Sequence, residues 1–228
     1  LSAIAEQKSI WNIDQPVCDF FPAFQDTRVT LSHLLNHSSG FPAWLDLHAR
    51  YHEPNGRGAF SAVTTPEIAR HEYETRILAS HIPADFERQV TYSDLGFLLL
   101  GWALEKTTQM SLDALFQQWI LQPTGLTSLQ FLPTTPDVVP TEDCPWRGHI
   151  LRGEVHDDNC YVLGGVAGHA GLFGNAADVL RMGELWLRAF SQTNANATTP
   201  LLNPAIAQKY FTKKHVHEPI DLDGESSE

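Results

Sequence analysis

A tyrosine placed directly before an apolar helix is the first feature of the sequence that could do chemistry. Tyr92 lies in the phrase TYSD, and the apolar segment LGFLLLGWALEK follows at residues 95–106. A phenol that projects from a rigid helix start can take a proton from a nucleophilic hydroxyl when nearby cations lower its pKa. The structural alternative is that Ser93 or Asp94 caps the helix and Tyr92 simply packs.

A glycine-rich segment is the second candidate. Residues 164–174 read GGVAGHAGLFG, too many glycines for a regular helix or strand, and a helix is expected to follow. Backbone N–H groups of such a segment can face an anion or a carbonyl oxygen. The segment matches neither GxGxxG after a strand nor the GxxxxGK[ST] loop, so nucleotide binding is weakly supported. A tight crossing where only glycine fits explains the composition as well.

Two further groups of polar residues, one polar stretch and several histidine pairs, could also form a site. Residues 141–159 bring carboxylates, Arg147 and His156 close in sequence, and a solvated, hydrogen-bonded loop is the alternative to a site. Histidine pairs spaced by four residues can present two imidazoles to one zinc ion, but the phrase HExxH is absent and structural histidines are the better interpretation. The pairs are His33 and His37, His48 and His52, and the closer pair His215 and His217.

Helix signals dominate the elements that must position these residues. Caps and apolar spacing predict helices after Thr30, Thr65, Ser111 and Asn175, besides 95–106, and a short helix from Pro204. The segments 128–132 and 149–155 are the candidate strands. No linker divides the chain, so the residues predict one helix-rich α+β domain.

Composition and charge narrow the function classes. The 228 residues are 43% apolar, which is enough for a sizeable core, and the net charge of −12 argues against nucleic acid. The longest apolar stretch, residues 97–100, resumes after Gly101 but ends by Leu104. That is far short of the roughly 20 residues that span a bilayer. Residues 218–228 carry five acidic side chains and are expected to form a mobile tail after a domain of residues 1–217.

Three long phrases, taken together, resemble one known family. Residues 27–44 (TRVTLSHLLNHSSGFPAW), residues 92–131 and residues 153–187 (GEVHDDNCYVLGGVAGHAGLFGNAADVLRMGELWL) are similar to the serine β-lactamase and penicillin-binding-protein-like hydrolases. This is the group of class C β-lactamases, DD-peptidases and esterases. The resemblance runs from about residue 1 to 190 and implies the helical part of a β-lactamase/DD-peptidase-like fold, with an incomplete sheet.

The resemblance also implies roles for particular residues. The family uses a serine in Ser-x-x-Lys, a tyrosine in Tyr-x-Asn that shares the proton handling, and a third motif, Lys-Thr-Gly or His-x-Gly, on a sheet-edge strand. Tyr92 matches the tyrosine, and Asp94 stands where many members have asparagine, so these two are the candidate catalytic residues. No cofactor and no metal are implied. The candidate substrate-binding residues are His156, Asp157, Gly168, His169 and Gly171.

Two of the three family motifs are not matched in this sequence. The phrase His169-Ala170-Gly171 fits His-x-Gly formally, but it resembles the family's glycine-rich loop and not its third motif. None of the five lysines follows a serine by three residues, and LSAIAEQKSIWNIDQPV resembles the segment just after Ser-x-x-Lys. The nucleophile is therefore expected a few residues before Leu1, and the third motif beyond Glu228. On this interpretation the chain is an interior fragment, inactive alone, whose parent is a serine hydrolase.

The implied reaction is acyl transfer from an amide, β-lactam or ester. The expected substrate is a small molecule, an ester or a peptide, and peptidoglycan is one expected source of it. The first alternative is a non-catalytic domain that binds peptidoglycan or another partner, and a lesser one is a metal-dependent hydrolase that uses the histidine pairs. The resemblance favours the periplasm or cell envelope, with the cytoplasm as the alternative, and the sequence determines neither compartment nor oligomeric state.

Overall fold

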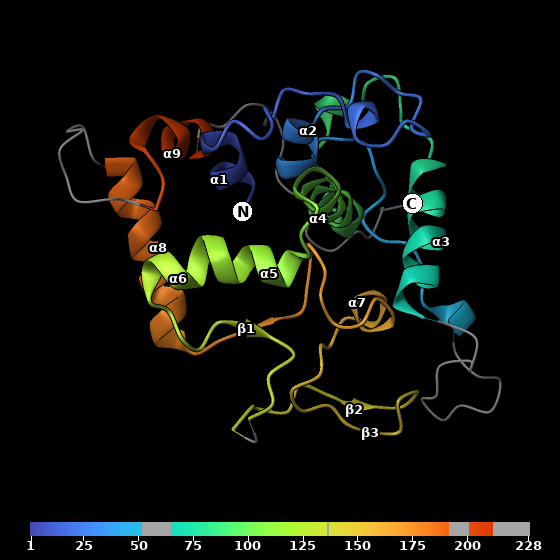
Figure 1. Cartoon of the computed structure of the whole chain (residues 1–228). Coiled ribbons are helices and arrows are strands. Elements are labelled where there is room, and N and C mark those ends of the chain that lie inside the picture. The colour runs from blue at the N-terminus through green and yellow to red at the C-terminus, as the bar shows by residue number, and fades with distance from the viewer. Residues whose placement is uncertain (52–64, 136, 192–200, 212–228) are drawn as a thin grey trace.

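The computed structural model describes residues 1–51, 65–135, 137–191 and 201–211 (Figure 1). Four sequence features lie outside these residues: His52, His215, His217 and the acidic segment 218–228. The prediction of a mobile tail therefore stays a prediction.

Helix α4 (Asp94–Thr108) is the buried centre of the fold. It is apolar on nearly every side, as expected for a helix that other elements surround, and each fully buried leucine contributes about 2 kcal/mol. The helix ends where Gln109 takes the left-handed conformation (φ 56°) and donates its N–H to the carbonyl of Glu105. Helices α1 (Ser2–Gln7), α2 (Leu31–Leu35) and α5 (Leu112–Phe116) pack against it. Its buried residues include Leu95, Leu98, Leu99, Trp102 and Leu104.

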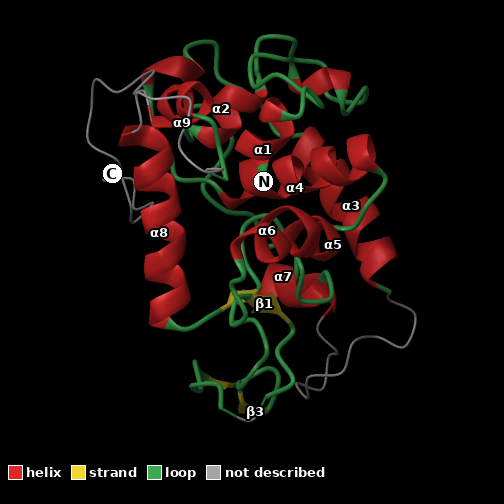
Figure 2. Ribbon diagram, turned by 60° about the vertical axis from the view of Figure 1, so that its left-hand side comes forward, coloured by secondary structure: helices red, strands yellow, loops and turns green. Residues whose placement is uncertain are grey.

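The remaining helices surround this centre, as Figure 1 shows. Helix α5 continues through a π-helical turn (Gln117–Leu121) into α6 (Gln122–Thr124), and short 3₁₀ turns occupy Val17–Asp19, Ala49–Tyr51 and Phe86–Arg88. In Figure 2, α8 stands at the side of the molecule, and its partner is α9. No helix within the described ranges has the length and apolarity that crossing a membrane requires. The other helices are α3 (Pro66–Leu78), α7 (Asp158–Val162), α8 (Ala176–Ser191) and α9 (Pro204–Phe211).

The helix starts predicted after Thr30, Thr65 and Asn175 are confirmed by their hydrogen bonds, whereas Ser111 makes no side-chain bond at the start of α5. Thr30 and His33 form a reciprocal capping box at α2, and the Thr65 hydroxyl accepts the N–H of Ile68 at α3. The Asn175 side chain accepts the N–H of Asp178 at the start of α8 (2.8 Å). Local side-chain chemistry was therefore a sufficient guide to where these helices begin.

The strands are shorter than the candidate segments predict. Strand β1 (Gln130–Phe131) pairs antiparallel with β4 (Leu172–Phe173), and β2 (Asp143–Cys144) pairs antiparallel with β3 (His149–Ile150). Segments 128–132 and 149–155 each contain one of them, whereas β2, β4 and α7 lie in segments that sequence analysis left irregular. Within the described residues there is no larger sheet, and the prediction of a helix-rich α+β chain with an incomplete sheet is confirmed.

The glycine-rich segment crosses directly over α4. A Cβ atom on Gly168 would lie 2.0 Å from the carbonyl oxygen of Phe97, and one on Gly101 would lie 3.2 Å from the Cα of Gly168. Gly171 has a φ of +104°, and its Cβ would lie 2.2 Å from the carbonyl oxygen of Gly165. Close packing thus explains the glycines at positions 101 and 168, where the segment crosses α4, and the glycine at position 171.

Candidate active site

Tyr92 projects from the start of the buried helix α4. Half of its surface is exposed (50%), while Ser93 beside it is almost fully buried. Ser93 occupies the N-cap position, but its hydroxyl donates to the carbonyl of Pro42 (2.7 Å) instead of capping the helix. The N–H of Asp94 donates to the carbonyl of Ala43 (3.1 Å). The phenol therefore extends from a segment that is tied to residues 42–43.

His37 makes a second set of contacts with the same segment. Its carbonyl oxygen accepts the N–H of Thr91 (2.9 Å), and its Nδ1 accepts the N–H of Ser93 (3.0 Å). Its ring lies 4.5 Å from the Tyr92 ring and stacks on Phe97 at 5.1 Å, both measured between ring centroids. Burial lowers the pKa of His37, which favours the neutral imidazole that an accepting Nδ1 requires.

A histidine and two carboxylates lie near this segment. The Nε2 of His169 is 2.9 Å from Oδ1 of Asp157, which also accepts the N–H of Cys160 as the N-cap of α7. Burial is the largest single effect on Asp157 and opposes its ionisation. Its hydrogen bond and charge interaction with His169, the N–H of Cys160 and the nearby His48 together outweigh burial, so that the pKa of Asp157 is lowered. Burial raises the pKa of Asp94; His169 opposes this effect and Asp157 adds to it. The three groups therefore act on one another electrostatically.

A cavity of about 390 Å³ lies between α4 and the glycine-rich segment. Leu1 and Phe97 are among its apolar lining residues, and Gly168, His169 and Gly171 line it as well. The His169 side chain is 3% exposed, and its Nδ1 has no hydrogen-bond partner. The cavity is thus mostly apolar, with one buried imidazole at its wall.

Arg147 fixes the backbone that carries the Asp157 carboxylate. Its guanidinium, which is completely buried, donates to the carbonyls of Val155 (2.6 Å) and His156 (3.1 Å) and to Oδ1 of Asp158 (2.6 Å). A guanidinium offers several donors in a rigid fork, so that one side chain can hold three acceptors of a turn. The polar stretch 141–159 is therefore an organised support, not only a solvated loop.

Asn159 connects this support to the segment that precedes α3. Its amide donates to the carbonyl of Leu45 (3.1 Å) and accepts the N–H of His48 (3.0 Å). The side chain is buried, so both bonds form away from water. Through these bonds residues 45–48 and α7 hold each other in place.

His156 lies apart from the other predicted residues. Its imidazole is 64% exposed and 3.5 Å from a carboxylate oxygen of Glu142. Together with Gly171 it lines a different, open cavity of about 780 Å³. Its role in substrate binding stays a prediction, as do those of Asp157, Gly168, His169 and Gly171.

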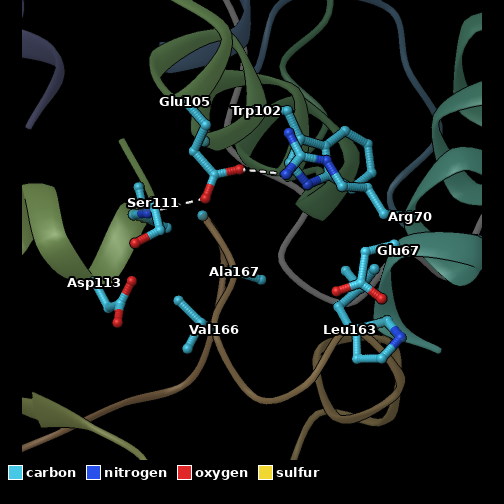
Figure 3. A pocket seen from close by; sticks show the side chains of 13 residues that line it. Glu67, Arg70, Trp102, Glu105, Ser111, Asp113, Leu163, Val166 and Ala167 are labelled. Carbon is cyan, nitrogen blue, oxygen red and sulfur yellow. Dashed lines mark hydrogen bonds and ion pairs between the residues drawn. The ribbon is translucent and has the colours of Figure 1, made fainter. Parts of the chain in front are cut away.

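A smaller hollow of about 180 Å³ lies on another side of the Gly101–Gly168 crossing (Figure 3). There the guanidinium of Arg70 pairs with Glu105 (2.6 Å) and lies 5.6 Å from the ring centroid of Trp102. The other carboxylate oxygen of Glu105 accepts the N–H of Leu112 at the start of α5 (2.9 Å). These charges are used in holding α3, α4 and α5 together, so the geometry favours a structural junction.

The histidine pairs were the basis of the metal alternative. His33 is used in the capping box of α2, and His37 binds the Tyr92 segment. His48 lies between Asp46 (3.3 Å) and Asp158 (3.5 Å). Across the part of the chain that the structure describes, no three His, Cys, Asp or Glu side chains form a group that could hold a metal ion.

The structure brings together Tyr92 and Asp94 at one helix start, and Asp157 and His169 in one hydrogen bond. Sequence analysis did not find the contacts of His37 with the Tyr92 segment, because its four-residue spacing from His33 was considered for metal binding instead. The sequence feature that could have indicated a role for His37 was its position in the phrase HSSGFP, which belongs to one of the segments that resemble the family.

The helix-rich portion of a β-lactamase/DD-peptidase-like domain is the class of protein that this fold defines. The family model described as Beta-lactamase matches residues 2–221, so the chain belongs to the beta-lactamase family. It is 29% identical over 194 residues to a proposed D-alanyl-D-alanine carboxypeptidase of Escherichia coli (strain K12). That match covers 73% of this chain but 42% of the relative, so the chain spans less than half of the relative's length.

Solved structures confirm the β-lactamase/DD-peptidase-like fold. A penicillin-binding protein from Bacillus halodurans matches with a TM-score of 0.62 at 20% identity, over 96% of this chain and 62% of that one. A class C β-lactamase from Rhodobacter sphaeroides matches with a TM-score of 0.60 at 19% identity, over 90% of this chain and 51% of that one. At these identities the likeness concerns the fold alone.

Proposed function

We propose that the chain is part of a serine hydrolase that works through an acyl-enzyme on an amide, β-lactam or ester. The observation that carries this proposal is the half-exposed phenol of Tyr92 on a segment that the protein holds from both sides. A group that transfers protons must be fixed in place yet reachable by substrate, and Tyr92 meets both conditions. Asp94 and the pair of Asp157 and His169 supply polar groups near it.

In the proposed reaction Tyr92 acts as the phenolate, after its own proton has passed to the neutral amine of the lysine in Ser-x-x-Lys. A serine Oγ forms a bond to the substrate carbonyl carbon as the serine proton passes to the Tyr92 oxygen. The proton then goes to the leaving nitrogen or oxygen as the bond from the carbonyl carbon breaks, which leaves the acyl group on the serine. A water molecule attacks this ester, gives its proton through Tyr92 back to the serine, and releases the acid. We place the serine in a Ser-x-x-Lys motif encoded upstream of Leu1, because no such motif occurs in the 228 residues.

The position of Leu1 supports this placement. Leu1 lines the same cavity as Phe97, whose ring stacks on His37, and His37 in turn contacts Tyr92. Residues attached before Leu1 would therefore begin at the cavity that Phe97 lines, one contact away from His37. The name of the curated relative favours a peptide that ends in D-alanyl-D-alanine as the substrate.

The test begins with the coding sequence upstream of Leu1. A Ser-x-x-Lys within about fifteen residues is expected, and its absence would exclude the enzyme. The 228-residue chain should not be labelled by a fluorescent penicillin, whereas the protein extended through that motif should be. In the extended protein Tyr92→Phe should slow labelling by about 10²- to 10⁴-fold, the usual contribution of a general base. Tyr161→Phe on α7 is the matched control and should leave the rate within about twofold.

A non-catalytic peptidoglycan-binding domain is the second candidate, favoured by the apolar cavity with its single imidazole. It predicts binding of soluble peptidoglycan fragments with no covalent labelling of the extended protein. In that case Tyr92→Phe would leave the dissociation constant unchanged.

A further inference from the structure

The conformation of His37 is unusual for its residue type. Helix α2 ends at Leu35, and two residues later His37 takes a left-handed backbone (φ 56°). That region favours glycine and asparagine, and other side chains adopt it at a cost that the surrounding structure must offset. His37 also makes three separate contacts with residues 91–93. The unusual backbone conformation therefore occurs at the residue whose side chain is held against the tyrosine segment.

The three contacts come from different parts of His37. The carbonyl oxygen accepts the N–H of Thr91, Nδ1 accepts the N–H of Ser93, and the ring packs on the ring of Tyr92 between them. The other contact of the ring is Phe97 on α4, at 5.1 Å and nearly parallel. The residues before and after the tyrosine are thus hydrogen-bonded to one histidine, and the tyrosine ring lies against it.

We propose that His37 is the positioning residue for Tyr92, and that protonation of its imidazole releases the tyrosine segment. This inference rests on the proposed role of Tyr92 in acyl transfer. A protonated imidazole carries a hydrogen on both nitrogens, so Nδ1 could no longer accept the N–H of Ser93. The titratable groups on the segment packed against the ring are the phenol of Tyr92 and the carboxyl of Asp94, and α4 contributes the apolar ring of Phe97. Burial, which lowers the pKa of His37, keeps the accepting form present at neutral pH.

The hydrogen bond can be tested on the 228-residue chain without any catalysis. Heteronuclear NMR should detect a scalar coupling between the backbone ¹⁵N of Ser93 and Nδ1 of His37 at pH 7. As the pH falls, this coupling should disappear, and the ring signals of Tyr92 should shift with the same midpoint as the His37 ring, below the usual histidine value of about 6.5. Core methyl signals, for example those of Leu99, report whether the fold persists.

Two variants separate positioning from folding. His37→Asn adopts the left-handed backbone readily and offers an amide oxygen near the place of Nδ1, so the Ser93 amide should keep its downfield position and lose its pH dependence. His37→Leu removes the acceptor, and the Ser93 amide should move upfield with a broadened Tyr92 ring. His33→Gln, on the preceding helix α2 and able to keep the capping box, is the control and should change neither.

In the protein extended through Ser-x-x-Lys, acylation should slow at least tenfold as the pH falls through the His37 midpoint, and His37→Asn should remove this step. Absence of the coupling at pH 7, or a Tyr92 ring that ignores the His37 titration, would overturn the positioning role whether or not the protein is labelled. Conversely, a clear coupling in an extended protein that neither a penicillin nor a fluorophosphonate labels would reject the proposed function and leave the hydrogen-bond arrangement standing.

Discussion

Asp94 carries a charge in a place that partly disfavours it. The residue begins α4, where the helix N-terminus attracts a carboxylate, yet burial raises its pKa; His169 opposes the rise and Asp157 adds to it. A carboxyl whose pKa is higher in the folded than in the unfolded protein lowers stability at neutral pH, and this cost fades as the pH falls and both states become protonated. The sign therefore predicts that removing the charge stabilises the protein most at neutral pH.

We expect Asp94→Asn to raise the free energy of unfolding by about 0.5 kcal/mol at pH 7, a value kept small because the group is half exposed. The gain should shrink toward zero near pH 4, and urea denaturation at the two pH values measures it. Asp113→Asn, at an exposed position in the first turn of α5, is the control and should give no gain at pH 7. Equal responses of the two variants would contradict the assignment of burial as the cause.

Some of the candidate site could be predicted from individual residues, and some could not. Tyr92 was found because its signal is local: a tyrosine directly before an apolar helix. The role of His37 depends on a backbone group 56 positions away, and its spacing in sequence does not show that partner. Likewise the hydrogen bond of Asp157 with His169 joins two segments that sequence analysis treated as separate features.

The same distinction holds for the secondary-structure elements. Helix starts were predicted because caps lie within three residues of the groups they bind. Strand β4 was missed because its two residues pair with β1 more than 40 positions earlier, inside a segment whose glycines disguised any strand pattern. The glycines themselves allowed two interpretations, and only the contact of Gly168 with α4 shows that a close crossing requires them.

The crossing of the glycine-rich segment over α4 gives a prediction at the scale of elements. Gly168→Ala would place a methyl group 2.0 Å from the carbonyl oxygen of Phe97, so the segment and α4 must move apart. We expect a loss of about 3 kcal/mol, or a fall in Tm of roughly 6–12 °C. Gly183→Ala, inside α8 with no atom within 4 Å of the new Cβ, should instead gain about 0.5–1 kcal/mol. Thermal unfolding followed by circular dichroism measures both, and similar shifts would contradict the crossing.

At the scale of the whole molecule, the apolar surface is distributed unevenly. Helix α9 covers one edge of α8, where the ring of Phe211 packs against Trp186 (5.4 Å) and Phe190 (5.2 Å). The adjoining edge of α8 is open: Val179, Leu180 and Leu187 are each more than half exposed. Several exposed apolar side chains on one edge of a helix, here called the open stripe, are typical of a surface that another segment or partner covers.

The open stripe predicts that the 228-residue chain associates with itself and binds a hydrophobic dye. Val179→Lys and Leu187→Lys should each reduce association by several-fold in sedimentation velocity, with little change in the free energy of unfolding, because neither side chain is buried. Each of these variants also makes the net charge of −12 less negative by one unit. Ala177→Lys makes the same change in charge on the polar face of α8, outside the stripe, and is therefore the control. An equal effect of Ala177→Lys would assign association to charge instead of the stripe.

Because the chain spans less than half of its curated relative, we further expect a protein extended to that length to bind less dye. Unchanged dye binding by the extended protein would show that the stripe serves a separate partner.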